Sequence, residues 1–230
     1  MANSSLAQHA VELNLPNHEY KKYYFGIVLG YNKATYSITH DSTFIGSNLS
    51  GSKKIIGIES SNMGRIHLGI MANYQFSKRF DLRFYPLNLI FSEYQMYYTQ
   101  TSGDVPEIYK PHSIESIVMN FPLQLRLKSD RINNFRVYSL AGLKYGFDLA
   151  SNARSSSEEL KIRKNVFGVE GGIGFQFFLP YFILSPEIKI SYGTNNLHAR
   201  DAGYLYSGLV DKMNSRMIMF SLHFEGGGKD

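Results

Sequence analysis

The chain has 230 residues, of which 43% are hydrophobic, carries a net charge of +5 and contains no cysteine. This length suffices for one sizeable core or one closed barrel, so we expect a single domain. No apolar run approaches the roughly 20 residues that a membrane-spanning helix needs, and the absence of cysteine excludes disulfides and cysteine-based zinc sites. Because Lys and Arg are spread along the chain, the charge does not indicate a nucleic-acid partner.

Period-two alternation of apolar and polar residues is the dominant pattern. In the clearest segment, Ile66, Leu68 and Ile70 share one face, whereas Arg65 and His67 share the other. Such segments have about the length of a tilted membrane strand, roughly 9–11 residues. Eight of them are predicted as strands, at about 23–32, 65–76, 80–97, 117–128, 135–148, 167–177, 182–193 and 218–224. The sequence therefore predicts an all-β fold, an eight-stranded antiparallel up-and-down transmembrane β-barrel of the OmpX/OmpA-like type.

Short and long connections alternate between the predicted strands. The long connections lie at about 34–62, 99–113, 149–165 and 194–214, which places all of them at one end of the barrel. Small outer-membrane barrels have short periplasmic turns and long external loops. We therefore expect residues 1–22 to form a periplasmic N-terminal segment, 23–225 the barrel and 226–230 a flexible tail, with both termini in the periplasm.

Three prolines fall inside predicted strands, at Pro86, Pro122 and Pro186. Proline cannot donate a hydrogen bond to a strand ladder. We expect a bulge, a kink or a strand end at each of these positions.

The alternation alone fits two kinds of barrel, one in lipid and one in water with its apolar face turned inward, as in lipocalins. Aromatic residues near the strand ends favour lipid, because they would form the interfacial girdles of a membrane barrel. The polar face combines many glycines with charges of both signs, which suits a narrow, filled interior. The predicted lumen charge network consists of Arg83, Arg126, Arg136, Lys144, Glu170, Glu187 and Lys189.

Several stretches resemble the PorT family, outer-membrane barrels of the Bacteroidetes type IX secretion system. They are residues 25–32, 125–148, 177–197 and 215–225. The resemblance implies an accessory component that is required for cargo export, and for gliding motility in some species. It also implies contacts with other components of that system, besides outer-membrane lipid and lipopolysaccharide. No catalytic, cofactor-binding or metal-ligating residues and no cofactor follow from it.

Two other functions remain open. The first is a structural or adhesive OmpX-like barrel whose loops contact surfaces. The second is a barrel enzyme, a lipase or protease, with its site on the external rim, where His40-Asp41, His112, His198 and Asp201 are predicted to lie. Because the chain has no HExxH or GxSxG motif, we expect the protein not to be an enzyme.

Overall fold

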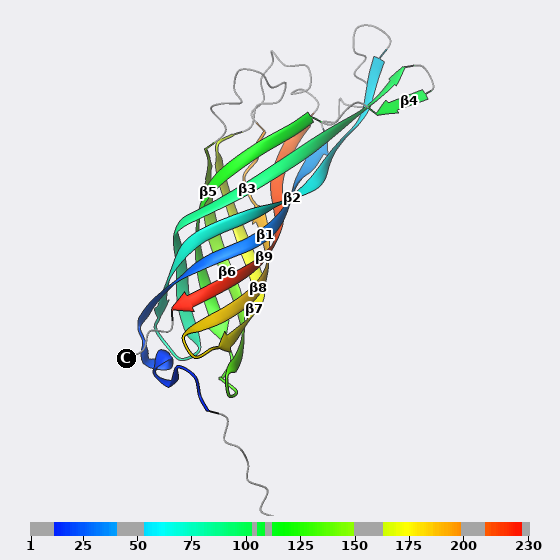
Figure 1. Cartoon of the computed structure of the whole chain (residues 1–230). Helices are drawn as coiled ribbons and strands as arrows, with labels where there is room; N and C mark the ends of the chain where they lie inside the picture. The colour runs from blue at the N-terminus through cyan, green and yellow to red at the C-terminus, as the bar shows by residue number, and fades with distance from the viewer. Residues whose placement is uncertain are drawn as a thin grey trace, which may run out of the picture.

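A computed structural model describes residues 12–40, 53–102, 105–108, 112–149, 163–198 and 210–226 (Figure 1). A short 3-10 helix, η1 (Pro16–Tyr20), precedes the strands. The strands are β1 (Tyr23–His40), β2 (Lys53–Gln75), β3 (Phe80–Ser102), β4 (Val105–Ile108), β5 (His112–Lys128), β6 (Phe135–Asp148), β7 (Asn165–Phe178), β8 (Phe182–Gly193) and β9 (Val210–Gly226). Within these ranges, no helix is long and apolar enough to cross a membrane.

Eight of the strands close into an antiparallel barrel. Each strand pairs with its neighbour in the order β1, β2, β3, β5, β6, β7, β8 and β9, and β9 pairs again with β1. The small β4 lies outside this ring, paired with the far end of β3. The predicted fold class is confirmed. Closure pairs the backbone groups along the ring, which is what allows strands to lie in hydrocarbon.

The predicted strands differ from the observed ones mainly in length. β6 and β8 have the predicted bounds, whereas β1, β2, β3 and β9 extend well into the predicted long connections. β2 and β3 remain paired up to Lys53 and Ser102. Together with β4 they form an arm that projects beyond the barrel in Figure 1. The apolar–polar alternation of β2 and β3 ends before the strands do. The arm lies beyond the barrel wall, so its two faces do not contact lumen and lipid, and nothing requires apolar and polar residues to alternate there.

Apolar side chains cover the outside of the barrel and polar ones fill it. Ile27 and Leu143 are 57% and 67% exposed, whereas Glu225 and Arg126 are fully buried. This is the reverse of a soluble barrel, so the lipocalin-type alternative is wrong. The outward apolar surface is suited to lipid.

Aromatic rings cluster at two levels of the outer surface. Near the short turns, Tyr23 contacts Tyr74, and Phe135 lies 5.4 Å from Phe177; higher up, Tyr145 lies 5.0 Å from Phe167. Phe135 and Tyr145 are ten residues apart on β6, or about 33 Å along a strand. At a strand tilt of roughly 40° this is about 25 Å of height, the thickness of the apolar band in membrane barrels.

Pro86 lies in a β-bulge, at which the alternation of β3 changes phase. The registers with both β2 and β5 shift by one residue on β3 between Phe84 and Leu89. Before the bulge Arg83 faces the lumen, and after it the even-numbered Asn88 does so. By contrast, Pro122 and Pro186 lie in β5 and β8 without a register shift toward β6 and β9, and neither strand ends at its proline. Toward β3 and β7 the pairing is interrupted around each proline, between Met119 and Leu123 and between Leu184 and Glu187.

Candidate functional site

The lumen near the short turns contains a dense group of charged and phenolic side chains, here called the lower network. Its members are Tyr24, Asp81, Arg83, Arg126, Lys128, Tyr138, Glu187 and Glu225. They come from six of the eight barrel strands. β3 and β5 contribute two members each, and β1, β6, β8 and β9 contribute one each.

Asp81 is the centre of one half of the lower network. The Arg126 guanidinium donates to both carboxylate oxygens, from Nε at 2.6 Å and from a terminal nitrogen at 2.7 Å. The Lys128 ammonium lies 3.0 Å from the same carboxylate, and the Tyr24 hydroxyl donates to it at 2.9 Å. Such a bidentate arginine fork is the strongest and most directional form of an ion pair.

Arg83 is the centre of the other half. Its two terminal nitrogens donate to Glu187 at 2.8 Å and to Glu225 at 2.9 Å, and Glu225 also accepts from Arg126 at 3.1 Å. Glu225 therefore joins the two halves. Tyr138 donates to Glu187 at 2.8 Å, and its ring occupies the place that a side chain at residue 174 would need, which accounts for glycine there.

His223 borders this network in a defined tautomer. Its Nδ1 lies 3.1 Å from the Ser185 carbonyl oxygen, which can only accept, so that Nδ1 carries the proton. Its Nε2 then accepts from the Tyr85 hydroxyl at 3.0 Å.

Charges of the two signs balance inside the barrel. Among the side chains that the structure describes, the buried cationic residues are Arg83, Arg126, Lys128, Arg136, Lys144 and Lys189. The buried anionic residues are Asp81, Glu93, Asp148, Glu170, Glu187 and Glu225. Burying a charge is costly unless it is paired and hydrogen-bonded. The balance indicates a packed, electrically neutral filling.

The seven predicted lumen residues all lie in the interior, but in four separate environments. Arg83, Arg126 and Glu187 belong to the lower network. Glu170 and Lys189 form a second cluster, 3.6 Å apart, in which Gln124 donates to Glu170. Arg136 pairs with Glu19 of η1, and Lys144 lies higher in the lumen.

Sequence reasoning missed Asp81, Lys128 and Glu225 as partners in this network. The sequence did contain a signal for them, because residues two apart on a strand face the same side. Asp81, Lys128 and Glu225 lie two residues from the inward-facing Arg83, Arg126 and His223, respectively. Glu225 was overlooked because it lies next to the glycine-rich end of the sequence.

The segment 12–22 lies across the short-turn end of the barrel (Figure 1). Arg131, in the β5–β6 turn, donates to the Asn14 carbonyl at 2.5 Å and lies 3.7 Å above the Phe178 ring. Asn14 in turn donates to Asn134 and to the Phe178 carbonyl, both at 2.9 Å. These contacts hold the segment against the barrel wall.

His18 of η1 is the residue that this segment buries. It is 4% exposed and packs edge-on against Tyr24 at 4.7 Å. Its Nε2 has no hydrogen-bond partner. Burial, with help from the positive charge of Lys128, lowers the pKa of His18 from 6.5 to about 4, against the opposing effect of Glu225. His18 is therefore neutral while the segment is docked.

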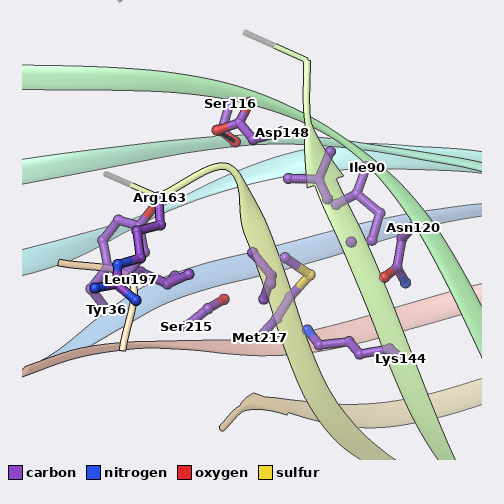
Figure 2. A pocket seen from close by; sticks show the side chains of 13 residues that line it. Tyr36, Ile90, Ser116, Asn120, Lys144, Asp148, Arg163, Leu197, Ser215 and Met217 are labelled. Carbon is purple, nitrogen blue, oxygen red and sulfur yellow. Dashed lines mark hydrogen bonds between the residues drawn. The ribbon is translucent and has the colours of Figure 1, made fainter. Parts of the chain in front are cut away.

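Toward the long connections the lumen contains a cavity of about 30 Å³, here called the upper cavity. Its polar lining includes Asn120, Lys144 and Ser215, and its apolar lining includes Ile90 and Met217 (Figure 2). A water molecule needs about 10–15 Å³ on this measure, so the space is that of two or three water molecules. In the lower network, by contrast, every charged member has an opposite charge within 3.1 Å.

The histidines considered for a rim enzyme are not assembled into a site by the described residues. The side chains of His40 and His112, and all of Asp41 and Asp201, lie outside the described part of the chain. His198 is buried. Within the described ranges, no group of three or more His, Asp or Glu side chains could hold a metal ion. The absence of enzyme activity stays a prediction.

Comparisons with known proteins place this geometry in context. The chain is similar to OprG of Pseudomonas aeruginosa, with 17% identity, coverage of 89% of this chain and 96% of that one, and a TM-score of 0.42. It is similar to Ail, the attachment invasion locus protein of Yersinia pestis, in complex with the heparin analogue sucrose octasulfate, with 10% identity, coverage of 89% and 99%, and a TM-score of 0.39. No curated protein sequence matches the chain.

A match to a protein-family model assigns the chain to a family. The model described as outer membrane protein beta-barrel domain matches residues 7–199, which is most of the 230-residue chain. The chain therefore belongs to the outer membrane protein beta-barrel domain family.

Proposed function

We propose that this protein is a closed, non-catalytic outer-membrane scaffold that acts as an accessory component of the type IX secretion system. In this role it is required for export of cargo proteins, and for gliding motility in some species. The support for the secretion role is the resemblance of residues 125–148, 177–197 and 215–225 to the PorT family. Its orientation in this proposal has the N-terminal segment and the short turns in the periplasm.

The filled lumen is the observation that carries the scaffold part of the proposal. Arg83 and Arg126 are fully buried, cross-linked through Glu225, and lie above an N-terminal segment that covers the barrel mouth. An eight-stranded barrel is only wide enough for its own side chains. A folded cargo protein therefore has no path through this barrel. In this proposal the protein acts through contacts at its rims and outer wall.

Two surfaces are the best candidates for partner contact. One is the docked segment 12–22 with the β5–β6 turn, which would face periplasmic components. The other is the arm of β2, β3 and β4 at the opposite end. The apolar outer wall would contact lipid, lipopolysaccharide or a neighbouring barrel.

Gene deletion tests the secretion role. Deleting the gene in its native host should trap type IX cargo in the periplasm, and expressing the wild-type protein should restore export. The deletion strain that carries an empty vector is the control. Normal export in the deletion strain would refute the secretion role while leaving the scaffold architecture intact.

An adhesive barrel is the second candidate, favoured by the projecting arm. The last β1–β2 pair is Lys33 with Gly64, and β2 continues to Lys53 with β3 along one edge. Within the described chain, no strand pairs with the other edge of this part of β2. Removing the arm above Gly64 while keeping the barrel should abolish binding to host cells or matrix if adhesion is the function. Unchanged binding would exclude the arm as an adhesin.

A further inference from the structure

The upper cavity differs from the lower network in the state of the lysine that lines it. Lys144 of β6 is 8% exposed and lines the cavity. Among the described residues, its ammonium makes no ion pair or hydrogen bond. The two other lysines in the lumen have partners, since Lys128 lies 3.0 Å from Asp81 and Lys189 lies 3.6 Å from Glu170. A buried ammonium without a direct hydrogen-bond or ion-pair partner is costly.

Two further groups line the same space without a described partner. The Asn120 amide and the Ser215 hydroxyl are 3% and 5% exposed, and both lie around the cavity with Lys144 in Figure 2. An ammonium, an amide and a hydroxyl together can donate several hydrogen bonds. The set is therefore rich in donors and carries a positive charge.

The anionic residue of the cavity is already engaged. Asp148 accepts from the Ser116 hydroxyl at 3.0 Å, and Glu170, which attracts Lys144 electrostatically, is held by Lys189 and Gln124. The side chain of Lys144 runs from β6 toward Met217 in Figure 2. Its path depends on Gly168, where a Cβ would come within 2.7 Å of the Lys144 Cε.

From this arrangement we infer that the upper cavity binds a small carboxylate, with the carboxylate group on Lys144, Asn120 and Ser215. The neighbouring apolar side chains, Ile90 and Met217, would take its methyl group. The space of two or three water molecules fits an anion of the size of acetate and excludes sugar phosphates and larger acids. This inference does not depend on the secretion role.

The test uses the full-length protein refolded in uncharged detergent, with its methionine methyl groups labelled with ¹³C. Titration with acetate should shift the Met217 methyl resonance in a saturable way, with a Kd on the order of 1 mM for so small a ligand. The methyl of Met71, which is fully buried between Val28 and Tyr85, should not move. Lys144→Met should weaken acetate binding at least tenfold, whereas Lys33→Met, on the outer surface, should leave it unchanged.

Lys144→Gln is a second variant in case the methionine variant does not refold, and folding of each is checked by its shifted migration on unheated gels. Absence of a saturable shift in the wild type would overturn the inference, and would be the result if Lys144 pairs with Glu170 instead. Retention of full binding in folded Lys144→Met or Lys144→Gln would also overturn it. Chloride binding as tightly as acetate would refute the carboxylate specificity.

Discussion

The two halves of the lumen are built from the same residue types but in opposite ways. In the lower network each described charge has an opposite charge within hydrogen-bond distance, and Glu225 links both arginines. In the upper cavity Lys144 lines an open space and forms no ion pair with another described residue. We infer that the two halves have different roles. The lower network stabilises and closes the barrel, whereas the upper cavity is available to a ligand.

The largest effect should follow from breaking the lower network. Arg126→Met removes the bidentate partner of Asp81 and one partner of Glu225, leaving their charges buried. We expect a loss of about 3–5 kcal/mol in the free energy of unfolding, the usual cost of removing one member of a buried ion pair. Urea unfolding in detergent micelles measures it. A loss below 1 kcal/mol would show that the network contributes little.

Docking of the N-terminal segment should depend on pH through His18. The pKa of His18 is about 4 when docked and 6.5 when free, so docking is fully stable above pH 6.5 and weakens as pH falls toward 4. The total loss is about 3 kcal/mol, at about 1.4 kcal/mol per pH unit. Because the chain has no cysteine, a spin label at Glu12→Cys reports the mobility of the segment.

His18→Phe is the matched variant for this prediction. It keeps the ring that packs on Tyr24 and removes the unpartnered Nε2. The label should then stay immobile between pH 7 and pH 4.5. A pH response that persists in the phenylalanine variant would assign the effect to another group.

Lys144→Met should have a much smaller effect on stability than Arg126→Met. Because the ammonium has no described partner, its removal costs no ion pair, and we expect a change of less than about 1 kcal/mol. The same urea titration measures both variants. A loss of unfolding free energy as large as that of Arg126→Met would show that Lys144 is part of the stabilising network. The two halves of the lumen would then not differ in the way described.

The smallest effect should come from the exposed pair of Arg79 and Asp130, at 2.9 Å. Asp130→Ala should change the free energy of unfolding by about 0–1 kcal/mol, because exposed ion pairs are screened by water. A loss comparable to that of Arg126→Met would contradict the view that burial, rather than pairing alone, gives the lower network its strength.

The sequence predicts the barrel wall well because lipid and lumen impose opposite demands on alternate residues. β6 and β8 were predicted with their observed bounds for this reason. The prediction of strand bounds and of which residues face inward was less accurate where alternate residues do not face lipid and lumen. The arm of β2 and β3 has no such two-sided environment, and one extra residue at Pro86 reversed the phase of β3.

Pairing inside the lumen could not be predicted in the same way. The sequence indicates that Arg83, Glu187 and Glu225 face inward, but β3, β8 and β9 meet across the lumen only at heights set by the stagger of the closed barrel. Whether Lys144 finds a partner depends on the same stagger. Alternation identifies the lumen residues, whereas the three-dimensional register determines their contacts.

Conductance across a planar lipid bilayer is the most direct test of the central claim, that the lumen is filled and the protein acts as a scaffold. We expect no steady ion channel for the full-length wild-type protein after insertion, at neutral pH. A stable, open channel under these conditions would contradict it, because ions would then pass through the space that Arg83, Arg126 and the N-terminal segment occupy.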